Sequence, residues 1–225
     1  MKHLPVIIFG TAGLAKETYI LIKQCNEKPQ LNGLSFEFLG FVSEDDCQIG
    51  STIVDNQKVI ASDSTISDFL GRHEVIGAFL PFGFPAVKRK VYERTKKYKN
   101  IIFPTLIHPS VVYDQDTVHI GAGTIIAAGN VITVDCVIEE FNYINVGCVI
   151  GHDANLKKFN VVNPGALISG NVTMGNECLI GAGATILQGL SLEDGVTLGA
   201  GAVLTKNAKQ WKTYIGVPAK EVKDR

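Results

Sequence analysis

The sequence has no run of 18 apolar residues, no CxxC pair and no excess of either charge. A membrane-spanning helix needs about 20 apolar residues, so we expect none, and Leu4–Phe9 is too short for the apolar region of a signal peptide. The 21 basic and 22 acidic residues give a net charge of -1, which offers no electrostatic case for a nucleic-acid partner. The content of 46% hydrophobic and 19% charged residues argues against a disordered chain. The length of 225 residues predicts one or two domains.

Cysteine is scarce and irregularly spaced. The five cysteines are Cys25, Cys47, Cys136, Cys148 and Cys178, an odd number without metal-ligand spacing. Cys136 and Cys148 fall where a repeat places small hydrophobic side chains. We therefore expect reduced structural thiols in a cytoplasmic protein, and neither a catalytic cysteine nor a metal site.

The second half of the chain repeats every six residues. An aliphatic residue stands at each sixth position from Ile120 to Leu204, and four residues later comes a mostly small or β-branched residue. The looser fits are Asn130, Asn142, Asn160 and Leu190. A period of six does not match 3.6 residues per turn, so it predicts short strands and turns that must stack to bury their apolar side chains. Three hexads make one triangular coil of 18 residues, and residues 120–203 therefore predict four to five coils. Glycine is frequent at the turns, where positive φ or close backbone approach would require it.

Residues 1–106 lack the hexad and read as alternating strands and helices. We expect strands at 6–9, 36–42 and 74–80, a helix at 14–24, and a basic helix at 87–98 whose lysines and arginines face solvent. Gly10–Gly13 forms a tight turn that leaves backbone N–H groups at a helix N-terminus, which suits a phosphate. The turn is GxxG and not GxGxxG, and the second strand ends in Ser43, so a dinucleotide is weakly indicated and a purely structural turn stays open.

The order of these motifs resembles the NeuD/PglD-type sugar O- or N-acyltransferases over nearly all of the chain. The motifs are the turn with Gly10, Gly13 and Lys16, the linker 107–110, the hexads, and the segment 215–220. The resemblance implies an α/β N-terminal Rossmann-like domain over 1–106 and an all-β C-terminal left-handed parallel β-helix over 107–225. It also implies a soluble homotrimer with a nucleotide-linked sugar in the first domain and acetyl-CoA between subunits.

The resemblance identifies His152 as the general base and Asp153 as the group that orients it. A sugar amine or hydroxyl must lose a proton as it attacks a thioester, and imidazole, with an ordinary pKa near ~6.5, can accept that proton. An incidental surface histidine is the alternative. Residues 18 apart stack on adjacent coils, so Gly170 and then Gln188 follow His152. The resemblance gives the Gly170 N–H the oxyanion role, with no side chain there to obstruct a ligand.

Further binding residues are implied by the same resemblance. Acetyl-CoA, as co-substrate and without a metal, is expected to contact Gly170, Gln188, Ala200, Pro218, Ala219 and Lys220. The nucleotide-linked amino sugar is expected to contact Gly10, Thr11, Ala12, Gly13, Lys16, Glu44, Asp45 and Asn145. The chain departs from the family at Leu14, where many members have histidine, and at Ser43–Asp45, where many have paired acids, so the nucleotide is not named.

These expectations favour N-acetylation of a nucleotide-linked 4-amino sugar for bacterial surface or glycoprotein glycans. Transfer to a hydroxyl, as on sialic acid, uses the same base and is the nearest alternative. A carbonic anhydrase would need three histidines converging on zinc, and only His119 and His152 lie in the regular repeat. A non-catalytic β-helix assembly subunit, with His152 incidental, is the remaining alternative.

Overall fold

The computed structural model describes residues 3–28 and 35–222. Backbone contacts divide the chain into two compact units. The first unit comprises residues 1–83 and 87–109, and the second comprises residues 84–86 and 110–225. Each unit is described by itself.

The first unit is built on a sheet of order β3-β4-β2-β1-β5-β6. Its strands are parallel except that β3 runs antiparallel to β4. The strands of this sheet are β1 (His3–Phe9), β2 (Ser35–Ser43), β3 (Thr52–Val54), β4 (Gln57–Ser62), β5 (Ile76–Phe79) and β6 (Ile101–Ile102). A further short strand, β7 (Leu106–Ile107), is not part of it. The helices are α1 (Gly13–Glu27), the 3-10 helix η1 (Asp46–Gln48), α2 (Ile66–Leu70) and α3 (Pro85–Thr95).

The core of this unit lies around β1, as its continuous apolar run predicts. Val6–Phe9 are at most 1% exposed, and β1 lies between β2 and β5 in the sheet. The expected Rossmann-like arrangement is confirmed, while β3, β4, η1 and α2 were not foreseen. The expectation that every lysine of the basic helix faces solvent is wrong for Lys88, which is 2% exposed. Burial lowers the pKa of Lys88 to about 7.

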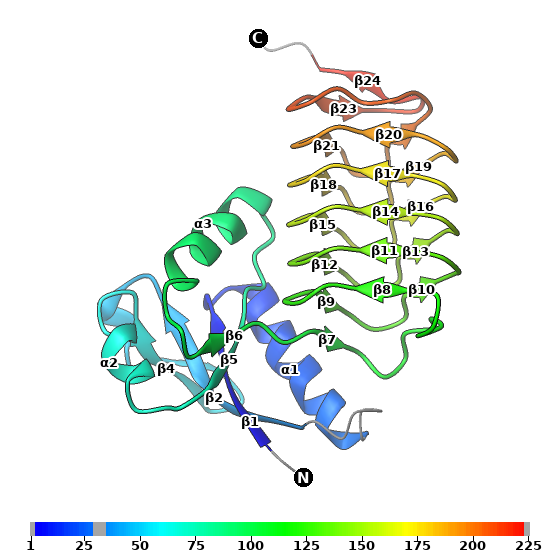
Figure 1. The fold of residues 1–225 in the computed structure, drawn as a ribbon. Helices are drawn as coiled ribbons and strands as arrows, with labels where there is room; N and C mark the ends of the chain where they lie inside the picture. Colours follow the sequence, from blue (N-terminus) through cyan, green and yellow to red (C-terminus); the bar gives the residue numbers. More distant parts are fainter. Residues whose placement is uncertain (1–2, 29–34, 223–225) are drawn as a thin grey trace. The chain divides into compact units, whose positions relative to one another are not determined.

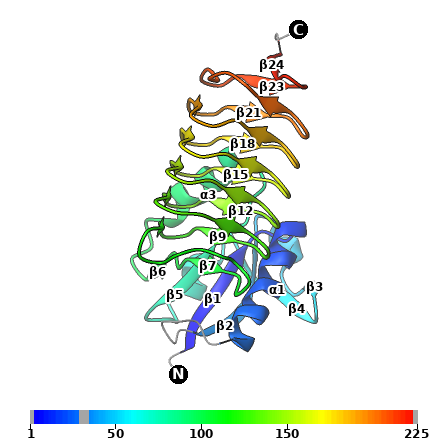
Figure 2. The same cartoon turned by 90° about the vertical axis from the view of Figure 1, so that its right-hand side faces the viewer.

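The second unit is a parallel β-helix (Figures 1 and 2). Its short strands are β8 (His119–Ile120), β9 (Ile125–Ile126), β10 (Val131–Ile132), β11 (Val137–Ile138), β12 (Tyr143–Ile144), β13 (Val149–Ile150), β14 (Asn155–Leu156), β15 (Val161–Val162), β16 (Leu167–Ile168), β17 (Thr173–Met174), β18 (Leu179–Ile180), β19 (Thr185–Ile186), β20 (Ser191–Leu192), β21 (Thr197–Leu198), β22 (Val203–Leu204), β23 (Thr213–Ile215) and β24 (Lys220–Glu221). Consecutive coils pair residue i with residue i+18, as Val149 with Leu167. The last strand, β24, pairs antiparallel with β23.

Three sheets form the faces of the coil stack. The first sheet has the order β10-β13-β16-β19-β22, and the second has the order β8-β11-β14-β17-β20. The third runs from β9 through β12, β15, β18 and β21 to β23 and β24. In each two-residue strand the second residue points inward, and these aliphatic side chains from Ile126 to Leu204 are buried. The hexad therefore encodes the direction of each side chain.

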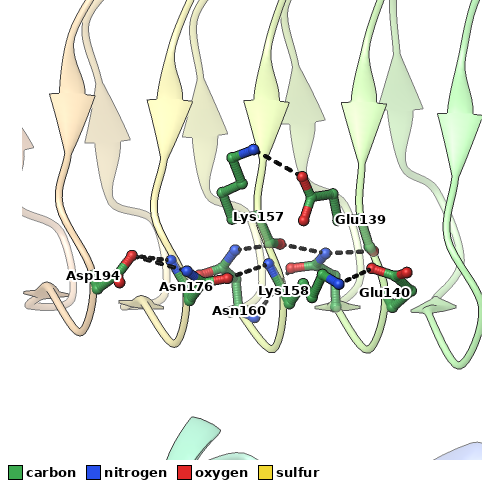
Figure 3. Close-up of polar contacts among 8 residues, drawn as sticks. Glu139, Glu140, Lys157, Lys158, Asn160, Asn176 and Asp194 are labelled. Atoms are coloured by element: carbon green, nitrogen blue, oxygen red, sulfur yellow. Dashed lines mark hydrogen bonds and ion pairs between the residues drawn. The ribbon is translucent and has the colours of Figure 1, made fainter.

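The asparagines that fit the repeat loosely are buried parts of it. Asn130, Asn142 and Asn160 are at most 1% exposed. Asn160 Nδ2 donates to Lys157 O at 2.8 Å, and its Oδ1 accepts from Cys178 N at 2.7 Å on the next coil. These amides satisfy backbone groups that the turns would otherwise leave buried and unpaired. Figure 3 shows Asn160 with its bond to Lys157 O, near the ion pairs of Lys157 with Glu139 and of Lys158 with Glu140.

Glycine meets both requirements expected at the turns. The second residue of each turn has positive φ, as Gly201 does at 64° and Asp153 at 59°. Gly151 and Gly181 instead approach the next coil so closely that a Cβ would collide with its backbone. The turn that carries Asp153 therefore uses one of the few non-glycine residues that tolerate this conformation.

Candidate functional site

His152 and Asp153 form the turn between β13 and β14. The His152 Nδ1 and Asp153 Oδ2 atoms are 2.7 Å apart, and the side chains are 49% and 58% exposed. Because a carboxylate only accepts hydrogen bonds, Nδ1–H donates and the Nε2 lone pair is left available. The pair can therefore orient an imidazole whose Nε2 accepts a proton from an incoming group.

Gly170 lies against the imidazole, one coil beyond His152. A Cβ at Gly170 would collide with His152 Nε2 and would lie 2.6 Å from Cε1 and 2.8 Å from Cδ2. The backbone holds the two turns together, since Asn171 N donates to His152 O at 2.6 Å. The stacking expected from the 18-residue coil is present. The expectation that the missing side chain leaves room for a ligand is wrong, because the imidazole fills that space.

The residues expected to contact acetyl-CoA fall into two groups. Gln188 follows Gly170 on the same edge of the sheet β10-β13-β16-β19-β22, in the turn after β19, and is exposed. Ala200 lies in the turn before β22, at the opposite edge of that sheet. The segment with Pro218–Lys220 lies beside β22, where Ala219 N donates to Val203 O at 2.7 Å. Within one chain, the structure does not bring these two groups together.

Asn145 does not lie beside the histidine. It precedes β13, whereas His152 follows that strand. The Asn145 side chain is part of its own turn, where Oδ1 accepts from Val146 N at 2.8 Å, and the residue is 6% exposed.

His119 is exposed on β8 and pairs with Val137, outside the stack that contains His152. Within residues 3–28 and 35–222, no group of three or more His, Cys, Asp or Glu side chains is placed to hold a metal.

A cavity of about 620 Å³ opens in the first unit at the carboxyl ends of β1 and β2. Five expected residues line it: Gly10, Thr11, Ala12, Glu44 and Asp45. Gly13 and Lys16 do not line it, and both are exposed at the start of α1. Gly10 has a φ of 99°, and a Cβ there would lie 3.3 Å from Phe82 Cε1, so a side chain at this position would strain the backbone and crowd Phe82.

The cavity carries both signs of charge. Hydrogen bonds from the Cys47 thiol and amide hold the pKa of Asp45 below its usual value, so this wall stays anionic. Lys90 and Arg94 of α3 line the cavity. Arg94 Nη1 pairs with Asp63 Oδ2 at 2.5 Å, although burial raises the pKa of Asp63. Such a cavity can take an anion beside a group that donates hydrogen bonds.

Comparisons with known proteins match this architecture. Residues 171–206 match the family described as the hexapeptide repeat of succinyl-transferase. The acetyltransferase domain of PglB from Neisseria gonorrhoeae, solved with acetyl coenzyme A, is 27% identical with a TM-score of 0.82, covering 98% of this chain and 100% of that one. These similarities support a resemblance to the NeuD/PglD-type acyltransferases, and the protein is an acyltransferase.

Two further structures share the fold of this acyltransferase. Perosamine N-acetyltransferase from Caulobacter crescentus, in complex with CoA and GDP-perosamine, is 24% identical with a TM-score of 0.86, covering 98% of this chain and 97% of that one. WeeI from Acinetobacter baumannii is 23% identical with a TM-score of 0.82, covering 97% and 100%. The left-handed parallel β-helix is thereby confirmed. No curated protein has a significant match to the sequence.

Sequence reasoning missed part of the acyltransferase's cavity. Phe82, Lys90 and Arg94 come from the loop after β5 and from α3, far along the chain from the glycine turn. The basic composition of α3 was the available signal, but it was interpreted as a solvated helix face.

None of the helices formed by the described residues has the length and apolar character that a membrane span requires.

Proposed function

We propose that the protein is an acetyl-CoA-dependent N-acetyltransferase acting on a nucleotide-linked 4-amino sugar. The observation that carries this proposal is the His152–Asp153 pair, which leaves Nε2 available as a base on an exposed turn of the β-helix. The Caulobacter neighbour, whose complex holds CoA and GDP-perosamine, supports an amino-sugar acceptor. Both substrates would be met in the cytoplasm.

The proposed reaction is a direct transfer. The sugar amine attacks the thioester carbonyl carbon, and His152 Nε2 takes the proton that the amine loses. The C–N bond forms, the C–S bond breaks, and the imidazolium returns its proton to the departing thiolate of coenzyme A. The Gly170 N–H, from which no described residue accepts a hydrogen bond, would stabilise the oxyanion.

Acetyl-CoA would be held by residues of two subunits. Gly170 and Gln188 lie at one edge of the sheet β10-β13-β16-β19-β22, and Ala200 with Pro218–Lys220 lies at the other. The outward face of this sheet carries Val131, Val149 and Leu167, which are 37% to 40% exposed. A row of exposed aliphatic side chains supports a homotrimer, in which one subunit's histidine edge meets a neighbour's Ala200 edge.

The nucleotide would occupy the cavity of the first unit. Backbone N–H groups of the glycine turn at the start of α1 suit a diphosphate, and Lys90 and Arg94 in the cavity lining supply positive charge. Glu44 and Asp45 would accept hydrogen bonds from the base or the ribose. This assignment places the nucleotide-linked sugar in the domain over 1–106 and the transfer chemistry in the domain over 107–225.

The test is to identify the product. The protein is incubated with acetyl-CoA and UDP-, dTDP- and GDP-linked 4-amino sugars, and the products are analysed by mass spectrometry and NMR. An acetyl group on the amine nitrogen of one sugar supports the proposal and names the nucleotide. Acetylation of hydroxyl acceptors such as sialic acid, with none of the amines modified, would overturn the N-acetyl assignment. Native mass spectrometry of the same sample checks the trimer.

A further inference from the structure

Gly170 occupies a turn position that readily accepts a side chain. The first residue of each β-helix turn recurs every six residues from Ala122 to Ala200, and only position 170 is glycine. On the same edge, Val134, His152 and Gln188 carry side chains at this position. Its φ is outside the positive range that favours glycine. The backbone therefore does not require glycine at this position.

The imidazole of His152 accounts for the glycine. The three heavy atoms nearest to a Cβ at Gly170 all belong to that ring, namely Nε2, Cε1 and Cδ2. Gly170 itself is buried, although it lies in a turn. The ring thus lies flat enough against the Gly170 backbone to fill the space of a methyl group.

We infer that Gly170 is a positioning residue that seats the His152 imidazole, in addition to any contact that its N–H makes. This inference rests on the proposed function for its catalytic consequence, but the seating is a structural statement of its own. Asp153 holds the ring at Nδ1, and the Gly170 backbone limits its position at Nε2. A ring held at both nitrogens presents the Nε2 lone pair in one place, which general-base catalysis requires.

The Gly170→Ala variant separates the seat from the oxyanion donor, because alanine keeps the backbone N–H. We expect the added methyl group to displace Nε2 and to lower kcat by about 100-fold, as a displacement near 1 Å does elsewhere. The KM for acetyl-CoA should change by less than about three-fold, because uniform binding is retained. Val134→Ala is the matched control, since it shortens the residue stacked on the other side of His152, and it should keep its kcat.

Measurements that do not depend on enzyme activity test directly whether Gly170 positions the His152 ring. In protein labelled with ¹⁵N-histidine, the His152 imidazole resonances should shift in Gly170→Ala and stay unchanged in Val134→Ala. In thermal unfolding, Gly170→Ala should lower Tm in the wild-type background and have no such effect in the His152→Ala background, where the Cβ meets no ring. This double-mutant cycle also shows whether the variants fold.

The outcomes distinguish the two proposals. Unchanged His152 resonances together with a wild-type kcat in Gly170→Ala would overturn the seat and leave the acetyltransferase standing. Shifted resonances in a protein that acetylates no acceptor would overturn the proposed function and leave the seat standing. Equal Tm losses in both backgrounds would show that the backbone, and not the His152 ring, requires glycine at position 170, and would overturn the inference.

Discussion

The imidazole of His152 lies against the backbone of Gly170, one coil further along the β-helix. The ring fills the space that a side chain at 170 would occupy, and its Nδ1 atom is 2.7 Å from Asp153 Oδ2. One turn supplies the histidine and its carboxylate, and the next turn supplies the surface on which the ring lies. The arrangement follows from the 18-residue coil, which places positions 152 and 170 in one stack.

Replacing Asp153 by Asn should impair turnover without unfolding the protein. Asparagine tolerates the φ of 59° at this position, so the turn is kept. The amide can donate to Nδ1 and favour the tautomer whose Nε2 carries the proton, which removes the base. We expect kcat to fall by about ten-fold or more. Steady-state kinetics with both substrates and circular dichroism check this, and a wild-type kcat would contradict the orienting role.

Replacing Asn160 by Ala should destabilise the β-helix strongly. The side chain is fully buried, and its loss leaves the Cys178 amide without its acceptor, while the Lys157 carbonyl keeps the hydrogen bond from Asn142 Nδ2. One buried amide left unpaired predicts a loss of about 1–3 kcal/mol. Cys178→Ala, one coil further in the same stack, is the control and should cost less, because it removes only weak sulfur hydrogen bonds. Urea unfolding of both variants makes the comparison, and equal losses would contradict the role given to the ladder.

Replacing Lys90 by Met should weaken binding of the nucleotide-linked sugar and leave binding of acetyl-CoA unchanged. Lys90 lines the cavity of the first unit. Loss of one charge-assisted contact to a phosphate predicts a rise of about ten-fold in the KM for the sugar. Lys96→Met is the control, because Lys96 pairs with Glu93 and does not line the cavity. A rise in the KM for acetyl-CoA instead would place the nucleotide elsewhere.

Asp55 should make stability depend on pH on the acid side. It accepts hydrogen bonds from Lys23 Nζ at 2.6 Å and Tyr19 Oη at 3.0 Å, and these hold its pKa below the usual 3.8. A lowered pKa in the folded state adds stability above pH 3.8 that is lost as the pH falls through the folded-state value. Asp55→Asn should therefore lower Tm at neutral pH, and the difference from wild type should vanish in strong acid. Calorimetry across this range checks the sign, and a difference that grows in acid would contradict it.

The repeating half of the chain could be predicted closely because its period encodes side-chain direction. The hexads locate the inward aliphatic residues and place Gly170 next to His152 before any coordinates are known. They do not reveal that the imidazole fills the space above Gly170, since that depends on a side-chain torsion. The buried asparagines were underestimated, because their value lies in hydrogen bonds between turns and not in apolar character.

The first unit could be predicted less well. Its sheet places β1 between β2 and β5, so residues 70 positions apart or more, such as Gly10 and Phe82, meet at one cavity. No spacing in the sequence shows that convergence. The burial of Lys88 on a helix rich in positive charge was likewise hidden, because composition does not tell which turn of a helix faces the sheet.

Coenzyme A release tests the central claim most directly. Wild-type protein and His152→Ala are each incubated with acetyl-CoA and the panel of nucleotide-linked 4-amino sugars, and the free thiol is followed with a colorimetric reagent. The account predicts turnover with one amino sugar and a rate about 100-fold to 10,000-fold lower in the variant, the range expected for loss of a general base. Equal rates in both proteins would contradict the role of His152, and the base would then have to be sought elsewhere on the β-helix.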